Sequence, residues 1–406
     1  MAEHLRLGSW DLLKGYTGGD DRDFAPRVAM QMVNESALCQ NRIRKKNYLT
    51  HQGIELLNGL SFLASDEEAH ALLNNLTVFQ SQQFQEALSL VRKANGHYKG
   101  DIIAIDPHRI ISTTKRVMPM KKKHPGEPAK KMLQTFFSID AQTGQPIGFG
   151  IGSPGTNTTK ATLALIDMIS HVGGRNSLVL ADKEHYTQEL IDNLGKSAQF
   201  ELLVPAVGSQ RMQKLVREIK YQPHWAGYSI AETMFSFDNS SKKYRLIVQR
   251  EGEVKGEYDY MPFIALSDRP AVDLVSEQYQ KRWLIEEFFN FDGAMGFDRA
   301  STFNLNIRYG KMSLALLAQA ATYQLRQKLP KPYERWNAVH LANALFNKID
   351  GDIRVKNDTI LVTCYNVPKE FDLANNYVNL PQKLEAEGVN PHVPWMYDFK
   401  LDFRFK

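Results

Sequence analysis

The stretch YQKRWLIEEFFNF, residues 279–291, combines an arginine and two glutamates in one predicted helix. Because an α-helix turns about 100° per residue, the side chains of Tyr279, Arg282 and Glu286 are expected to share one face. Three apolar side chains on the opposite side are expected to pack against a core: Leu284, Phe288 and Phe291. The pattern by itself also fits a surface helix with a polar face, so its meaning depends on the rest of the chain.

Two aspartates follow short apolar stretches that are typical of buried strands: Asp106 in IIAIDPH and Asp182 in LVLADKEH. Functional groups of open α/β sheets collect beyond the carboxyl ends of strands, although a single aspartate there also fits a turn. Glu286, on a helix beside such a sheet, would bring a third carboxylate. Three converging carboxylates repel one another unless cations lie between them, and oxygen ligands suit Mg²⁺ or Mn²⁺. Two such ions about 3.5–4 Å apart support phosphodiester cleavage.

The elements that must position these carboxylates follow a helical front part. Residues 1–98 are predicted to be helical, with a capping box formed by Ser65 and Glu68. Strands and helices then alternate in this order: strands 101–106, 133–140 and 146–152, helix 159–174, strand 177–182, helix 186–195 and strand 200–206. This order predicts a mixed α/β sheet flanked by helices.

The predicted core is interrupted after its last strand. Residues 207–262 are predicted to be largely β, and the helix that completes the core is delayed until Ala271. The chain is therefore expected to have four parts, namely a helical N-terminal domain over 1–98, an α/β core over 99–206 and 263–330, a β-rich insertion over 207–262, and a C-terminal region over 331–406.

Charge and cysteine content restrict the classes of partner. The net charge is only +5, but residues 115–131 carry seven Lys or Arg against one Glu, and RIRKK at 42–46 is also basic. Such stretches fit solvated loops as well as DNA backbone, and Lys121, Lys122 and Lys123 are the expected DNA contacts. The two cysteines lie far apart, which excludes a cysteine zinc site and indicates a reducing compartment. No apolar run predicts a membrane span or a signal peptide.

Taken together, two strand aspartates, a β insertion and a Y-x-x-R-x-x-x-E helix resemble the DDE transposases of bacterial insertion sequences, in particular the IS-four-type branch. The signature of that branch is Y-x-x-R-x-x-x-E-x-x-x-x-x-x-K, and Tyr279, Arg282 and Glu286 match its spacing. The resemblance covers roughly residues 100–325 and implies an RNase H-like core. It also implies that Asp106, Asp182 and Glu286 are the catalytic, metal-binding triad. Tyr279 and Arg282 would contact a phosphate or a displaced base.

The resemblance carries further expectations about function. It implies two Mg²⁺ or Mn²⁺ ions, cleavage of double-stranded DNA at terminal inverted repeats, and strand transfer into target DNA. The N-terminal helical domain would bind DNA, and the protein would act as a dimer on the DNA of a bacterial nucleoid in the cytoplasm, without a membrane. Two alternatives stay open, namely an RNase H-like nuclease without strand transfer and an inactive, domesticated transposase that binds DNA only.

The sequence departs from the branch signature at two positions. Gly293 stands where the signature has lysine, so that DNA contact is missing or is supplied by Arg299, Arg308 or Lys311. Glu184, two residues after Asp182, adds a fourth negative charge close to the expected metals. The terminal-repeat sequence, the target preference and the excision route do not follow from the sequence.

Overall fold

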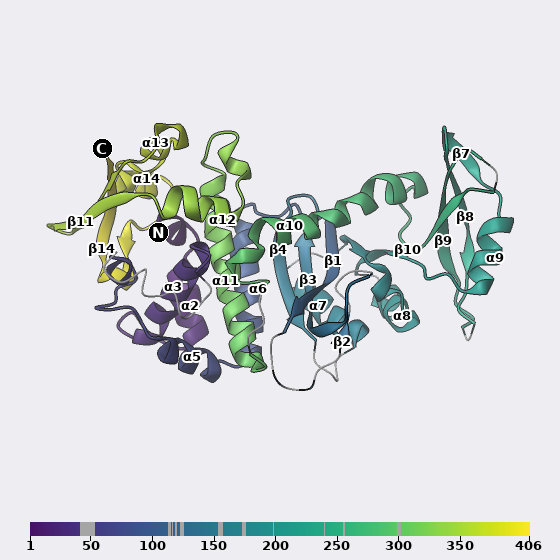
Figure 1. Cartoon of the computed structure of the whole chain (residues 1–406), viewed down its shortest axis with the longest axis horizontal. Helices are drawn as coiled ribbons and strands as arrows, with labels where there is room; N and C mark the ends of the chain where they lie inside the picture. The colour runs from purple at the N-terminus through teal and green to yellow at the C-terminus, as the bar shows by residue number, and fades with distance from the viewer. Residues whose placement is uncertain are drawn as a thin grey trace. The chain divides into compact units, whose positions relative to one another are not determined.

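The computed structural model describes residues 1–406 except 41–52, 113–114, 116, 118–119, 122–125, 153–156, 173–175, 198, 239, 255 and 299–301. The chain forms two compact units (Figure 1). Unit 1 consists of Met1–Asn95, Ile111–Arg116 and Phe289–Lys406, and unit 2 consists of Gly96–Ile110 and Val117–Phe288. Both units are therefore discontinuous in sequence.

Unit 2 is built on a mixed sheet, to which the described residues contribute ten strands. The core strands are β1 (Ile102–Ile111), β2 (Met120–Lys121), β3 (Lys130–Asp140), β4 (Gln145–Ile151), β5 (Leu178–Ala181) and β6 (Glu201–Pro205). The strands β1, β5 and β6 run parallel, whereas β3 and β4 are antiparallel. The order β4-β3-β1-β5-β6 is that of an RNase H-like sheet, so the predicted mixed α/β fold is confirmed.

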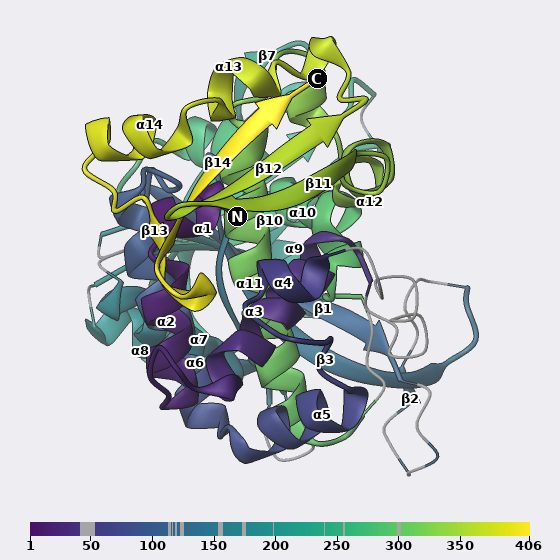
Figure 2. The same cartoon turned by 90° about the vertical axis from the view of Figure 1, so that its left-hand side faces the viewer.

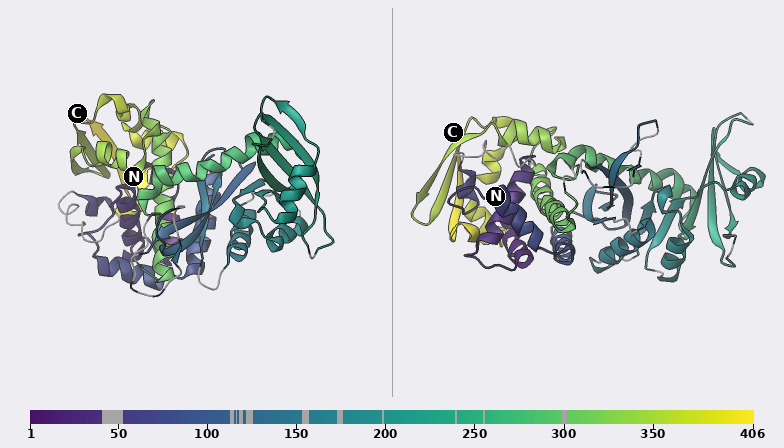
Figure 3. Two further views of the ribbon diagram at one scale, coloured as in Figure 1. Left: turned by 45° about the vertical axis from the view of Figure 1, so that its right-hand side comes forward. Right: turned by 60° about the horizontal axis from the view of Figure 1, so that its bottom comes forward.

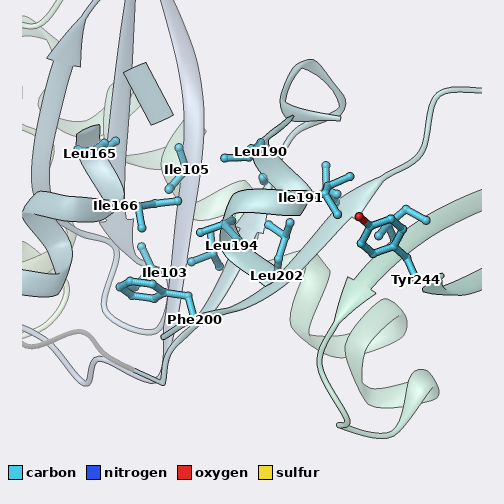
Figure 4. Close-up of a cluster of buried hydrophobic side chains, with 14 of the residues drawn as sticks. Ile103, Ile105, Leu165, Ile166, Leu190, Ile191, Leu194, Phe200, Leu202 and Tyr244 are labelled. Atoms are coloured by element: carbon cyan, nitrogen blue, oxygen red, sulfur yellow. The ribbon is translucent and has the colours of Figure 1, made fainter. Parts of the chain in front are cut away.

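The core of unit 2 forms because its parallel strands carry apolar side chains on both faces, as strands covered by helices do. Helices α7 (Thr158–His171) and α8 (Gln188–Ser197) contribute to the same apolar cluster as the strands. Figure 4 shows this cluster, with Ile103 and Ile105 of β1 close to Leu165 and Ile166 of α7 and to the apolar side chains of α8. Burying each such side chain stabilises the fold by about 1.5–3 kcal/mol.

The region after β6 extends the same sheet. Strands β7 (Gln222–Trp225), β8 (Tyr228–Phe235), β9 (Tyr244–Glu251) and β10 (Asp259–Leu266) are antiparallel, and β10 pairs with β6 (Figure 3, teal). The expected boundary between residues 262 and 263 lies inside β10. The region also contains helix α9 (Gln210–Glu218), which the β-like pattern did not predict. Met212 and Val216 of α9 are buried in the apolar cluster of unit 2.

The segment before Glu286 is helical but not uniform. It consists of a π-helix η3 (Asp273–Gln278), a 3₁₀-helix η4 (Tyr279–Trp283) and α10 (Leu284–Asp292). The regular α-helix predicted from Ala271 is therefore wrong in its geometry, and such irregular turns are frequent at functional sites. The predicted core contacts are also partly wrong: Phe288 is buried, but Leu284 is only half-buried and Phe291 is 39% exposed, whereas Ile285, which was not predicted, is buried.

Unit 1 contains most of the helices. They are α1 (Ala2–Arg6), α2 (Ser9–Thr17), α3 (Phe24–Ala37), α4 (Ile54–Leu57), α5 (Asp66–Asn75), α6 (Val78–Ala94), α11 (Leu305–Arg326), α12 (Ala338–Leu341), α13 (Leu373–Tyr377) and α14 (Leu380–Ala386). The long helix α11 packs against α3, α5 and α6. The predicted capping box at the start of α5 is confirmed, since Ser65 and Glu68 exchange hydrogen bonds. None of the described helices is long and apolar enough to cross a bilayer.

The C-terminal part of unit 1 adds a small sheet that the sequence pattern did not predict. Its strands are β11 (Asp350–Lys356), β12 (Thr359–Tyr365), β13 (His392–Val393) and β14 (Phe399–Phe405), in the order β11-β12-β14-β13. Figure 2 shows this sheet together with α13 and α14, which pack against β14. Short 3₁₀- or π-helical turns complete the described chain: η2 (Lys183–His185), η5 (Gly293–Met295), η6 (Tyr333–Arg335), η7 (Ala342–Phe346), η8 (Lys369–Phe371) and η9 (Pro394–Met396).

Candidate active site

The register of two parallel strands brings Asp106 and Asp182 together. The last registered pair of β1 and β5 is Ile105 with Ala181, and the two aspartates are the next residues of their strands. Asp182 directly follows β5, as predicted, and its carboxylate caps η2 by accepting a hydrogen bond of 2.6 Å from the Lys183 backbone N–H. Asp106 lies within β1, which continues to Ile111, so its predicted position at a strand end is wrong. Both carboxylates nevertheless lie at the same edge of the core sheet.

Arg282 connects the helical segment to these aspartates. Its Nη1 donates a hydrogen bond of 2.8 Å to Asp106 Oδ1, and its Nη2 lies 3.7 Å from Glu286 Oε1. The guanidinium also lies 5.8 Å from the centre of the Tyr279 ring, which packs edge-on against Phe263 of β10. The predicted shared face of Tyr279, Arg282 and Glu286 is thereby confirmed, although the segment is not a regular α-helix.

The carboxylates at this edge are electrostatically coupled. The pKa of Asp106 is raised to about 7, chiefly because the side chain is only 18% exposed. The Arg282 guanidinium and, more weakly, that of Arg109 oppose this rise, whereas the negative charges of Asp182 and Glu286 add to it. With Asp106 itself counted, three carboxylates stand against two guanidinium groups here, and a further cation would stabilise the ionised form of Asp106.

The donor set fits a divalent metal ion. Carboxylate oxygens are the ligands that Mg²⁺ and Mn²⁺ prefer, and one cation, the Arg282 guanidinium, already lies between Asp106 and Glu286. In this structure, the described residues include no group of three His, Cys, Asp or Glu side chains that is close enough to hold a metal ion. Binding a metal would thus require Asp106, Asp182 and Glu286 to approach one another and Arg282 to release Asp106.

Glu184 is neutralised by a partner that the sequence analysis did not consider. Arg109, three residues after Asp106 on β1, forms an ion pair from its Nη2 to Glu184 Oε1. Gln134 of β3 donates a hydrogen bond of 3.2 Å to the other carboxylate oxygen of Glu184. The fourth negative charge is therefore compensated within unit 2. The signal that could have found this pair is the placement of both residues just beyond the two aspartates.

A pocket of about 480 Å³ lies beside Arg282 in unit 2. Its walls are formed by the end of β9, the start of β10 and the 3₁₀-helix η4. Trp283 lines this pocket and is 57% exposed, so its ring is not buried in the core. Burial raises the pKa of Tyr279, on the same wall, to about 12. The pocket thus offers aromatic rings next to an arginine, which suits a planar ligand group.

The structure describes only some of the other residues that were predicted to contact DNA. Lys121 lies in β2, whereas Lys122 and Lys123 lie outside the described residues. A Cβ at Gly293 would approach the Asp298 carboxylate to 2.5 Å, so a lysine there would need Asp298 to move. Of the three cations considered as replacements, Arg299 is outside the described residues, Lys311 is partly exposed, and Arg308 is 4% exposed.

Comparisons with known proteins give a family and two distant structures. A family model described as transposase DDE domain matches residues 97–320, which is more than half of the chain. No curated protein matches the sequence. The piggyBac transposase synaptic complex with hairpin DNA has 11% identity and a TM-score of 0.45, covering 80% of this chain and 75% of that chain. The Mos1 strand transfer complex has 16% identity and a TM-score of 0.18, covering 41% and 57%. Because both TM-scores are below 0.5, the fold assignment rests on the strand order.

Proposed function

The chain belongs to the transposase DDE domain family, and on this premise we propose that it is a metal-dependent transposase of the IS-four-type branch. It cuts double-stranded DNA at the terminal inverted repeats of a bacterial insertion sequence and joins the 3′-hydroxyl to target DNA. The observation that supports this most is the β1–β5 register, which places Asp106 beside Asp182, together with the contacts of Arg282 to Asp106 and Glu286.

In this proposal Asp106, Asp182 and Glu286 hold two Mg²⁺ or Mn²⁺ ions. When bound, the metal would activate a water or 3′-hydroxyl for attack and would stabilise the leaving oxygen. Arg282, once released from Asp106, presents its remaining N–H groups to a DNA phosphate, because a guanidinium offers only donors. Tyr279 holds Arg282 from one side through ring contact. The proposal is supported by the fold, which brings the Asp106 and Asp182 carboxylates and the Arg282 guanidinium to one edge of the sheet.

The DNA partner and the assembly are part of the same proposal. Two transposon ends must be brought together for strand transfer, which implies at least a dimer on DNA, acting on the nucleoid in the bacterial cytoplasm. The N-terminal helical domain, 1–98, is proposed to contribute DNA contacts. The rival functions, a nuclease without strand transfer and a DNA-binding relic, differ from the proposal in which product they form.

The test is nicking and strand transfer with a labelled end taken from the inverted repeats that flank the gene, in Mg²⁺. We expect Asp106→Asn, Asp182→Asn and Glu286→Gln each to abolish both reactions with little change in thermal melting. Glu287→Gln is the matched control, since Glu287 is exposed one residue away. Cleavage without transfer in the unaltered protein would favour the nuclease, and absence of both would favour the relic. Full activity in both aspartate variants would remove the transposase proposal.

Non-specific DNA backbone contact is assigned to Lys121, Lys122 and Lys123. Neutralising all three to glutamine should weaken DNA binding and flatten its salt dependence, by a slope of about 0.9 for each phosphate that the protein no longer neutralises. The measurement is the DNA dissociation constant between low and moderate salt. Glutamine at Lys214, an exposed residue of α9, gives a control for loss of surface charge alone. An unchanged slope in the triple variant would mean that these three lysines do not contact DNA phosphates.

A further inference from the structure

Three side chains from separate elements meet next to the candidate triad but are not members of it. Arg109 lies on β1 three residues beyond Asp106, and Glu184 lies in η2 two residues beyond Asp182. They form the Nη2–Oε1 ion pair, and Gln134 of β3 binds Oε2 of Glu184 at 3.2 Å. Arg109 and Glu184 are 75 residues apart in sequence, so only the packing of β1 beside β5 brings them together.

The Arg109–Glu184 ion pair lies just past the end of the hydrogen-bonded β1–β5 ladder. The registered β1–β5 ladder ends at Ile105 and Ala181, so both aspartates lie just beyond its last pair. Past that point the Arg109–Glu184 pair is a side-chain connection between the two chain segments that carry the aspartates. Both oxygens of Glu184 are engaged, one by Arg109 and one by Gln134.

We propose that Arg109 and Glu184 are positioning residues, which hold together the two chain segments that carry Asp106 and Asp182, so that both carboxylates can close on one metal ion. The inference rests on the proposed function. Each side chain of the pair is 27% exposed, so the pair should contribute little to global stability. Mutation of residues that orient metal ligands commonly lowers metal affinity or activity by about 10–100-fold, which is the scale expected here.

Two other roles for the same residues make different predictions. If Glu184 were itself a metal ligand, its loss would weaken metal binding regardless of Arg109. If Arg109 instead contacted a DNA phosphate, its loss would weaken DNA binding and leave the metal affinity of the DNA-free protein unchanged. Only the positioning role predicts that each single loss weakens Mn²⁺ binding and that losing both residues is no worse than losing either one.

The experiment measures Mn²⁺ binding to the DNA-free, full-length protein by calorimetry, with thermal melts of the metal-free protein alongside. The variants are Arg109→Met, Glu184→Gln, the double Arg109→Met/Glu184→Gln, and the charge swap Arg109→Glu/Glu184→Arg. Asp106→Asn is the reference for the metal site itself. We expect each single variant to weaken Mn²⁺ binding about tenfold, the double variant to be no worse than either single one, and the charge swap to recover most of the loss.

Each outcome decides between the roles. An unchanged Mn²⁺ affinity in Arg109→Met overturns the inference, and so does a charge swap as weak as the singles with normal melts. If Arg109→Met lowers the melting temperature strongly, Arg109→Lys keeps the positive charge and should restore Mn²⁺ affinity; failure of that rescue also overturns it. Unaltered Mn²⁺ binding in Asp106→Asn would refute the metal site of the proposed function, whereas impaired binding there with an unaffected Arg109→Met refutes the positioning role alone.

Discussion

Two aspartate–arginine pairs, one in each unit, have the same chemistry and opposite surroundings. In unit 1, Arg326 binds Asp292 through two hydrogen bonds of 2.6 and 3.0 Å, and the two side chains are 6% and 3% exposed. Gln319 donates a third bond of 2.9 Å to Asp292 and accepts one from Arg92. In unit 2, Arg282 gives Asp106 a single hydrogen bond, and two further carboxylates raise the pKa of Asp106.

The difference lies in how completely charge and hydrogen bonds are balanced. The Asp292 carboxylate has donors at both oxygens and two arginines in its network, so nothing further is needed to stabilise it. Around Asp106 the negative groups outnumber the cations that contact them, and Arg282 is shared with Glu286. A closed, balanced pair is a structural feature, whereas an under-compensated group of carboxylates is a place where a cation can bind.

The largest expected effect comes from breaking the balanced pair. Arg326→Met should lower the free energy of unfolding by about 3–5 kcal/mol, because it leaves a buried carboxylate without its counterion. Arg282→Met should lower it by less, because Asp106 is more exposed than Asp292 and, with its pKa raised to about 7, can be neutralised by a proton. Urea unfolding of the metal-free protein measures both changes. Equal losses in the two variants would show that the site in unit 2 is also a structural ion pair.

The second-largest expected effect is stabilisation by a divalent metal ion, which should depend on Asp106. At a Mg²⁺ concentration of about 100 times the dissociation constant, the unaltered protein should gain about 2.7 kcal/mol of stability. Asp106→Asn should remove this gain, because it removes a ligand, whereas the control Glu287→Gln should retain it. The measurement is the melting temperature as a function of Mg²⁺ concentration. A gain that survives in Asp106→Asn would place the ion elsewhere.

Arg282 should compete with the metal for Asp106. We expect Arg282→Ala to leave Mn²⁺ affinity intact or raise it by up to about tenfold, near 1.4 kcal/mol, while DNA end cleavage falls. The reason is that the Nη1 bond to Asp106 Oδ1 must break before a metal binds that oxygen. Lys281→Ala is the control, because Lys281 contacts Gln278 rather than a carboxylate. Weaker Mn²⁺ binding in Arg282→Ala would mean that Arg282 organises the metal site.

The smallest expected effect is the change in the free energy of unfolding when repulsion between Glu286 and Asp106 is removed. Glu286→Gln should stabilise the metal-free protein by about 0.5 kcal/mol, because it removes one of the like charges facing Asp106. Glu287→Gln, one residue away and exposed, should leave stability unchanged. Parallel urea titrations with repeated measurements resolve this difference. A larger gain of stability in Glu287→Gln would show that Glu287, rather than Glu286, is the third carboxylate of the triad.

Local patterns predicted the local structure well. The capping box at Ser65, the start of the strand after residue 101 and the helix after residue 158 each depend on neighbours within a few residues. The C-terminal sheet and helix α9 were missed, because their residues become β or helical only through partners distant in the chain. The 3₁₀ and π turns before Glu286 were also missed, since a 3.6-residue period cannot report local changes of helix type.

The sequence by itself determined the chemical inventory of the site, namely two aspartates after apolar strands and a Tyr-Arg-Glu spacing that keeps three side chains on one face. It also determined the α/β order of the core, because side-chain periodicity is a local property. Only the tertiary structure decided that Asp106 lies inside β1 beside Asp182, that Arg282 contacts it, and that Arg109 neutralises Glu184. Register, burial and charge coupling act through space between residues far apart in the chain, so no local pattern contains them.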